Sequence, residues 1–210
     1  QKIHLSIDAA DLRRMKEALP ERIYVPAAMR WGDLEIQNVG VRYKGDSSSQ
    51  PHQTHKRSYL IKVSHYEKDQ RFLGMERIAL DNGVQFGSLF SEPIVTEILR
   101  DLNIPASHCN HAQLFLNGED QGVYVNVERI DESFLQRCFG SASGALYKVH
   151  RPGPGANLAY AGPRLEDYKN CFLAKTAEAE AGYEDLVGLI QALGGDKNVP
   201  YEQVLGSKMV

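Results

Sequence analysis

The sequence VRYKGDSSS at residues 41–49 and the sequence KRSYLIKV at residues 56–63 give the strongest structural signal in this chain. Successive side chains of a strand point to opposite faces, so alternating apolar residues mark a strand with one buried face. Both runs and the residues beside them show this alternation, through Val39, Val41, Tyr43, Tyr59, Ile61 and Val63. We therefore expect the two runs to pair as a hairpin around a polar loop.

The opposite face of this hairpin is cationic. It gathers four cations and one hydroxyl group: Arg42, Lys44, Lys56, Ser58 and Lys62. Such a face suits phosphate, because lysine supplies a point charge, arginine a fork of donors and the loop its backbone N–H groups. A solvated sheet face is the alternative, since half-exposed antiparallel sheets commonly carry lysine outward. Side-chain alternation alone favours this alternative.

The composition is that of an ordinary globular protein of 210 residues, 42% of them hydrophobic and 24% charged. A formal charge of −3 argues against a general nucleic-acid binder, which needs a basic excess to neutralise phosphates. No apolar run approaches the roughly 20 residues of a membrane-spanning helix. The three cysteines are widely spaced and odd in number, so we expect free thiols, with a single bridge as the alternative.

Two further patterns predict regular elements. Residues 91–102 begin with a helix cap at Ser91 and continue with an apolar stripe, which predicts a helix. Residues 112–116 and 122–127 flank the pair Asn117-Gly118, and Asn-Gly between two β-rich runs is typical of a hairpin turn.

The composition changes from β-rich to helical along the chain, which predicts three regions. We expect a β-rich nucleotide-binding lobe at residues 1–150, a loop rich in glycine and proline at 151–164, and the start of a helical lobe at 165–210.

Standard catalytic and nucleotide-binding motifs are missing from the sequence. Residues 40–45 have the glycine spacing of a P-loop, but Asp46 stands where lysine is required. No nucleophile elbow and no ordinary protein-kinase motif is found. Histidine pairs at 52–55 and 108–111 lack a second pair of ligands, so we expect no metal site there. Glu128 ends a strand directly before a helix, which is a common position for a ligand-binding group.

Taken in order, these pieces resemble the CotH family, the spore-coat-protein-H type of atypical protein kinases. The resemblance extends over roughly residues 38–150, and its specificity lies in the order and spacing of five blocks. These blocks are residues 41–48, 56–62, 114–119, 122–131 and 146–148. The resemblance implies an α+β, protein-kinase-like fold. Its antiparallel β-rich N-terminal lobe would have a packed helix and lead into a helical segment, with the C-terminal lobe incomplete in this chain.

The resemblance also implies an activity. It is the ATP- and Mg²⁺-dependent transfer of the γ-phosphate to serine of a protein partner, in an extracytoplasmic or spore-coat setting. Lys56 would neutralise the ATP phosphates, assisted by Lys44 or Lys62. An acidic residue on a helix should fix that lysine, and both Glu97 and Glu92 fit this role.

The remaining implied site residues lie on the hairpin loop and near the connection between the lobes. Tyr124 or Tyr147 would lie near adenine. The complete set of implied ATP-binding residues is Lys44, Ser47, Ser48, Lys56, Lys62, Glu97, Tyr124 and Glu128.

The sequence departs from the family pattern in one respect. Family members carry a catalytic aspartate and a Trp-Asp-x-Asp metal motif after the point corresponding to Val210, and this chain has neither. Its one tryptophan is Trp31, followed by Gly32-Asp33. We therefore expect the nucleotide-binding part of a longer kinase, inactive on its own and without a metal ligand.

Two other functions stay open. The chain could be a non-catalytic, kinase-like module that serves structure or surface interaction in a coat or envelope. It could also be a sugar- or polyphosphate-binding domain that uses the cationic face, which would require the residue order to match the family by accident.

Overall fold

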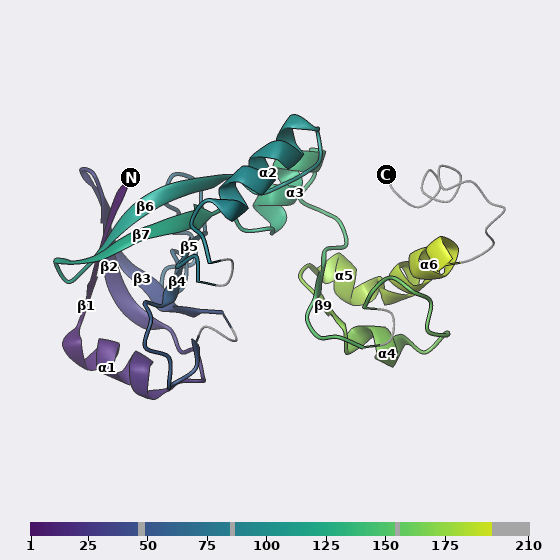
Figure 1. Cartoon of the computed structure of the whole chain (residues 1–210), viewed down its shortest axis with the longest axis horizontal. Coiled ribbons are helices and arrows are strands. Elements are labelled where there is room, and N and C mark those ends of the chain that lie inside the picture. Colours follow the sequence, from purple (N-terminus) through teal and green to yellow (C-terminus); the bar gives the residue numbers. More distant parts are fainter. Residues whose placement is uncertain (46–48, 85–86, 154–155, 195–210) are drawn as a thin grey trace. The chain divides into compact units, whose positions relative to one another are not determined.

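The computed structural model describes residues 1–45, 49–84, 87–153 and 156–194 (Figure 1). Its contacts divide the chain into two compact units, Gln1–Ile130 and Asp131–Val210. The first unit contains the cationic hairpin and is described first.

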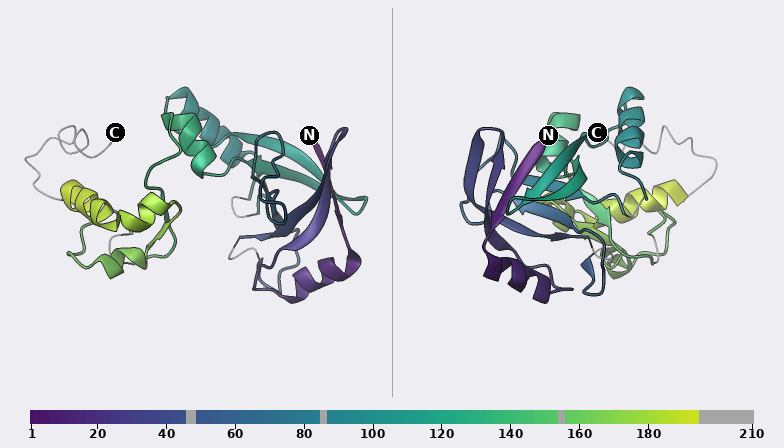
Figure 2. Two further views of the ribbon diagram at one scale, coloured as in Figure 1. Left: turned by 180° about the vertical axis from the view of Figure 1, so that it is seen from behind. Right: turned by 60° about the vertical axis from the view of Figure 1, so that its left-hand side comes forward.

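The first unit is a closed barrel of seven strands in the order β1-β2-β3-β4-β5-β7-β6. The strands are β1 (Lys2–Ile7), β2 (Val25–Trp31), β3 (Leu34–Lys44), β4 (Ser58–Lys62), β5 (Arg77–Asp81), β6 (Cys109–Leu116) and β7 (Glu119–Val127). All neighbouring pairs are antiparallel except β1 and β6, which run parallel and close the barrel. The two long strands of the β6–β7 hairpin can be followed in Figures 1 and 2.

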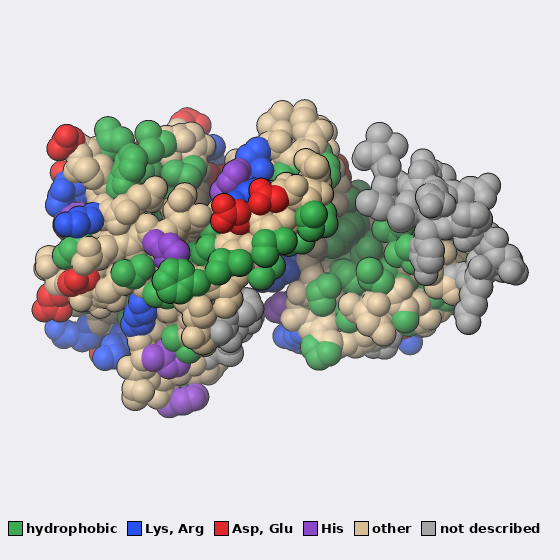
Figure 3. Space-filling model, turned by 45° about the horizontal axis from the view of Figure 1, so that its top comes forward, with side chains coloured by type: hydrophobic (Ala, Val, Ile, Leu, Met, Phe, Trp, Pro, Cys, Tyr) green, Lys and Arg blue, Asp and Glu red, His purple; other side chains and the backbone are tan. Residues whose placement is uncertain are grey.

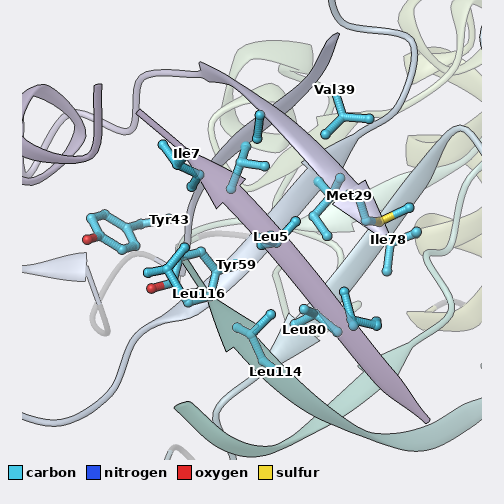
Figure 4. Packing of buried hydrophobic residues seen from close by; sticks show 14 of the residues in the cluster. Leu5, Ile7, Met29, Val39, Tyr43, Tyr59, Ile78, Leu80, Leu114 and Leu116 are labelled. Carbon is cyan, nitrogen blue, oxygen red and sulfur yellow. The ribbon is translucent and has the colours of Figure 1, made fainter. Parts of the chain in front are cut away.

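Alternating side chains of the strands fill the barrel (Figure 4). The six apolar residues of the predicted hairpin are all buried in this core. β3 and β4 pair antiparallel with Tyr43 opposite Tyr59 and Lys44 opposite Ser58. The predicted hairpin and its apolar face are therefore confirmed.

The predicted protein-kinase-like fold is wrong. That lobe was expected to have antiparallel pairing and a packed helix, whereas the structure has a closed barrel of mixed pairing. Closure depends on the parallel pairing of Lys2 with Gln113 and of Leu5 with Leu116. Pairing between strands so far apart in the sequence does not affect the local alternation of apolar residues. The patterns therefore predicted the strands but not the closure of the barrel.

Two helices flank the barrel. Helix α1 (Ala9–Glu17) begins at Asp8, whose side chain accepts a hydrogen bond from Ala10 N at 2.8 Å, and it packs on the barrel core through Met15. Helix α2 (Ser91–Asp101) has no buried residue. Most of its predicted apolar stripe is exposed instead, and hydrophobic side chains gather along α2 in the space-filling view (Figure 3).

The second unit contains four helices and a two-stranded sheet among its described residues. They are α3 (Glu132–Phe139), β8 (Tyr147–Val149), α4 (Leu165–Lys169), β9 (Phe172–Ala174), α5 (Ala177–Ala181) and α6 (Tyr183–Gly194). The unit has a hydrophobic core of its own, formed around Tyr168, Phe172 and Ile190. In the described parts of both units, no helix is long and apolar enough to span a membrane.

Candidate anion-binding site

The candidate site lies at one end of the barrel, where β3 ends, β4 begins and β5 ends. Lys44 is paired with Ser58 across β3 and β4, and Tyr59 is paired with Leu80 across β4 and β5. This register places Lys44, Ser58 and Asp81 at the same end of three neighbouring strands. Residues that follow β5 and the start of α2 complete the site.

Lys44 is held by an acid at the end of β5, across the intervening strand β4. Its Nζ lies 2.7 Å from Oδ2 of Asp81, and both side chains are partly buried. The other carboxylate oxygen of Asp81 accepts a hydrogen bond from Gly83 N at 3.1 Å. Asp81 was not among the predicted site residues, although Asp-Asn-Gly after a short apolar strand is a turn signal that fixes an acid at a strand end.

Glu92 adds a second acid from the first turn of α2. Burial raises the pKa of Glu92, the Asp81 carboxylate raises it further, and Lys44 opposes both effects. Glu97, the other helical acid considered, is exposed and has no side-chain partner in the described part of the chain. The structure therefore brings Glu92 rather than Glu97 to the site, and it sets Glu92 beside Lys44 rather than Lys56.

Lys56 lies over the middle of β7 (Glu119–Val127). Its Nζ donates a hydrogen bond to the carbonyl oxygen of Val123 and lies 4.3 Å from the centroid of the Tyr124 ring. Burial lowers the pKa of Lys56 because the ammonium loses hydration. Across residues 1–45, 49–84, 87–153 and 156–194, no carboxylate forms an ion pair with this amine. Its partners are a neutral carbonyl group and an aromatic face.

Asn82 contacts the chain at this lysine and two residues after it. Its side-chain amide donates to the carbonyl oxygen of Lys56 at 2.7 Å, and its backbone N–H donates to Oγ of Ser58 at 2.9 Å. Asn82 and Ser58 are both buried. The turn after β5 therefore holds the start of β4 in place, which positions Lys56.

Arg57 is a buried cation that the sequence analysis did not include among the ATP-binding residues. Its Nη2 donates to the carbonyl oxygens of Gln50 at 2.9 Å and Gln53 at 3.3 Å, and its guanidinium carbon lies 5.2 Å from the centroid of the Tyr43 ring. Its Nη1 is buried and has no hydrogen-bond partner among the described residues. A buried donor without a partner is unfavourable, so an anion that reached it would satisfy an existing need.

Three buried tyrosines form the floor beneath these cations. The ring centroids of Tyr43 and Tyr59 are 5.5 Å apart, and those of Tyr59 and Tyr124 are 6.2 Å apart. Burial raises the pKa of all three phenols, so they stay neutral. Tyr124 was predicted near adenine, and the structure places it within the barrel core, beneath Lys56.

Three other predicted site residues lie elsewhere. Lys62 is at the far end of β4, about 13 Å along the strand from Ser58, with Nζ 3.9 Å from Oε1 of Glu76. Glu128 follows β7, and its Oε2 accepts a hydrogen bond from His108 N at 2.8 Å. Tyr147 belongs to the second unit, where its hydroxyl donates to the carbonyl oxygen of Ala179 at 2.9 Å. Ser47 and Ser48 lie outside the described residues.

The described residues hold no group of three or more histidine, cysteine, aspartate or glutamate side chains that could bind a metal ion. Asp81 and Glu92 supply two carboxylates, and Asp81 is already engaged by Lys44 and Gly83. The chemistry available here is recognition of a negatively charged group by ammonium, guanidinium and backbone donors.

The fold and the site together define a closed β-barrel domain with a cationic end braced by acids. The sequence model of the family described as "CotH kinase protein" matches residues 41–209, and the chain belongs to this family. The inner spore coat protein H of Bacillus subtilis (strain 168) is 26% identical over 143 residues, which cover 68% of this chain and 37% of that protein. The chain thus spans about 37% of the length of this relative.

Proposed function

We propose that this barrel end binds the phosphates of ATP, and that the chain is the nucleotide-binding part of a serine protein kinase. The observation that supports the proposal most directly is the state of Lys56. Its ammonium is partly desolvated and contacts only neutral groups, whereas Lys44 nearby is paired with Asp81. A phosphate placed beside Lys56 would supply the missing negative charge.

The other residues have distinct roles under this proposal. Asp81 and Glu92 hold Lys44 at the rim, so that its amine meets an arriving phosphate in a fixed position. Arg57 offers the unsatisfied Nη1 beneath the loop that follows β3. Function resides in such sites rather than in the fold, so a barrel differing from a kinase lobe can still bind a nucleotide. The described residues hold no group of three or more metal-binding side chains, and we assign no step to Mg²⁺.

The proposed substrate is serine on a protein partner, and the proposed location is the spore coat. Both rest on family membership and on the similarity to an inner spore coat protein. Labelling of the protein in sporulating cells would test the location. Transfer of labelled phosphate from ATP to coat proteins, with the full-length protein as the catalyst, would test the activity.

Thermal melting with ATP tests the binding site directly. Full-length protein should melt at a higher temperature with ATP, because a ligand at 100 times its Kd stabilises the folded state by about 2.7 kcal/mol. Lys56→Ala should remove this shift. Lys68→Ala, which alters an exposed lysine in the turn after β4, should retain it. An undiminished ATP shift in Lys56→Ala would overturn the proposal.

A second candidate function is favoured by helix α2. Three of its apolar residues are exposed, with 53% of Ile94, 54% of Val95 and 53% of Ile98 accessible to solvent. An exposed apolar helix face of this kind marks an interaction surface in many proteins. The barrel would then be a non-catalytic coat or envelope module. Full-length protein that assembles with coat proteins but shows neither an ATP shift nor phosphate transfer would favour this function.

A further inference from the structure

A pocket of about 160 Å³ opens at the end of the barrel away from Lys44. Its floor is apolar and consists of Ile3, Met29 and Ile78, which are buried core residues. Trp31, the last residue of β2, and Phe72 form an aromatic wall with their rings edge to face at a centroid distance of 6.2 Å. An engineered cavity of similar size, about 150 Å³, holds one benzene ring. The pocket is therefore the right size for a single six-membered ring.

Two carboxamides occupy inward positions at the mouth of this pocket. Asn110 and Asn126 are directly paired across β6 and β7. Because side chains alternate along a strand, Asn110 shares a face with the buried Ala112, and Asn126 shares a face with the buried Tyr124. Alternation predicts apolar residues at both places. Asn110 is exposed and Asn126 is half-buried, and in the described part of the chain neither amide group makes a side-chain hydrogen bond, so both are available to a ligand in the pocket.

A strained turn forms part of the rim. Phe72 and Met75 exchange backbone hydrogen bonds of 3.0 and 2.9 Å around the two-residue turn Leu73-Gly74. Both turn residues have positive φ, 50° at Leu73 and 80° at Gly74. Asn-Gly is the usual choice for such a turn, and a leucine in this region costs on the order of 1 kcal/mol. Leu73 is 62% exposed, so burial of its side chain does not compensate for the cost of its backbone conformation.

We infer that this pocket binds a neutral single-ring group that carries a hydroxyl, which is the chemistry of a phenol. The side chains that line the pocket include no lysine, arginine, aspartate or glutamate, so no charged side chain there favours a charged ligand. The floor and the aromatic wall accommodate the ring, and the two amides can donate to and accept from the hydroxyl. A tyrosine side chain on a polypeptide and a small phenolic molecule share this chemistry. The inference does not depend on the proposed ATP site.

Tryptophan fluorescence provides the test, because Trp31 is the one tryptophan of the chain and lines the pocket. We expect p-cresol to change the emission saturably, with a Kd about tenfold lower than that of toluene, which has the same ring without the hydroxyl. One net hydrogen bond of about 1.4 kcal/mol produces this ratio. Absence of a saturable change, or equal binding of toluene and p-cresol, would overturn the inference.

Variants on one strand test the role of the amides. Asn126→Val should bring the ratio of the toluene and p-cresol dissociation constants close to one. Gln121→Val, a change on the same strand outside the pocket, should leave the ratio unchanged. The wild-type comparison of the two ligands stands even if a variant fails to fold. An Asn126→Val protein that still prefers p-cresol tenfold would contradict the assignment of the hydroxyl to this amide.

Two further ligands separate the possible sources of the ring. N-acetyltyrosinamide and a peptide with an internal tyrosine carry the phenol on a polypeptide backbone. Tighter binding of the peptide than of p-cresol would identify a protein tyrosine as the ligand. Binding of p-cresol without binding of either tyrosine derivative would identify a small phenolic molecule.

Discussion

The amine of Lys44 lies 2.7 Å from a carboxylate oxygen of Asp81 and so joins the end of β3 to the end of β5. Strand β4 separates these two strands in the barrel, so the ion pair spans it at the end where the candidate site lies. Asp81 also fixes the turn that follows through Gly83. The same acid therefore positions a cation of the site and the backbone beside it.

A double-mutant cycle should measure this link. We expect Lys44→Met and Asp81→Asn to show a coupling energy of about 1 kcal/mol in urea unfolding, at the upper end for partly exposed pairs. Asparagine keeps an oxygen for Gly83 N–H, so the cycle isolates the charge pair. The pair Lys62 and Glu76, separated by 3.9 Å, serves as the comparison and should show a smaller coupling. Equal coupling in the two cycles would contradict a special role for the Lys44 pair.

Glu92 should make stability depend on pH. Burial and Asp81 raise its pKa above the usual value of 4.5, so the ionised form is less favourable in the folded protein than in the unfolded chain. The protonated form of Glu92 therefore favours the folded protein. This contribution to folding stability is fully present below pH 4.5 and is lost as the pH rises through the raised pKa. Glutamine resembles the protonated form. Glu92→Gln should therefore melt about 1–2 °C higher than wild type at pH 7, because exposure and the α2 dipole keep the gain small.

The difference between Glu92→Gln and wild type should shrink as the pH falls below 4.5. Glu97→Gln on the same helix is the matched control, because that side chain is exposed and has no described partner. A melting difference for Glu92→Gln that is constant from pH 4 to pH 7 would argue against the proposed cause.

Gly40 is required by a close approach rather than by its backbone conformation. A Cβ atom at this position would lie 2.6 Å from the Cβ of His65, whose ring stacks on Tyr24 at a centroid distance of 4.2 Å. Gly40→Ala should therefore destabilise the protein by roughly 1–3 kcal/mol in urea unfolding, the usual cost of overpacking. Gly144→Ala, where a Cβ would meet nothing within 4 Å, should be close to neutral. Equal stability of the two variants would show that His65 moves away without cost.

The sequence could predict elements that depend on neighbouring residues. Alternation identified β3 and β4, and Asn-Gly identified the β6–β7 hairpin, because these features are set by residues close together in the chain. The helix at 91–102 was also recognised, but its apolar stripe suggested a packed helix. Periodicity records which face is apolar and does not record what covers it, and the structure leaves α2 without a buried residue.

The candidate site was predictable only in part for the same reason. Lys44 and Lys56 were found because they lie on one hairpin, and Lys62 was included because it shares their strand face. Strand direction, which places Lys62 about 13 Å from Ser58, separates it from the other two. Asp81 was not predicted because its role depends on Lys44, which lies in another strand. Arg57 was not predicted because its carbonyl partners, Gln50 and Gln53, are set by the conformation of the preceding loop, which the sequence pattern does not give.

Asn117 shows how a local turn residue acquires a role in closing the barrel. The sequence identified it as the first residue of a hairpin turn, and its φ of 51° agrees with that assignment. Its Oδ1 accepts a hydrogen bond from Ile7 N at 2.8 Å, and its Nδ2 donates to the carbonyl oxygen of Ile7 at 2.9 Å. Its own backbone N–H donates to the carbonyl oxygen of Leu5 at 2.8 Å. The side chain thus continues the β1–β6 pairing beyond the last strand residue.

Substitution of Asn117 should therefore weaken the seam between β1 and β6. Asn117→Ala removes both side-chain hydrogen bonds and places alanine at positive φ, so we expect a loss of about 2–3 kcal/mol in urea unfolding. Asn117→Gly loses the hydrogen bonds without the backbone strain, and Asn117→Asp keeps the acceptor for Ile7 N–H, so both should lose less than alanine. Amide hydrogen exchange at Ile7 should accelerate in the alanine and glycine variants and remain slow in the aspartate variant, because only aspartate preserves that hydrogen bond. If Asn117→Gly matched the wild type in stability and in exchange at Ile7, the turn would need only its backbone conformation and the seam would not depend on this side chain.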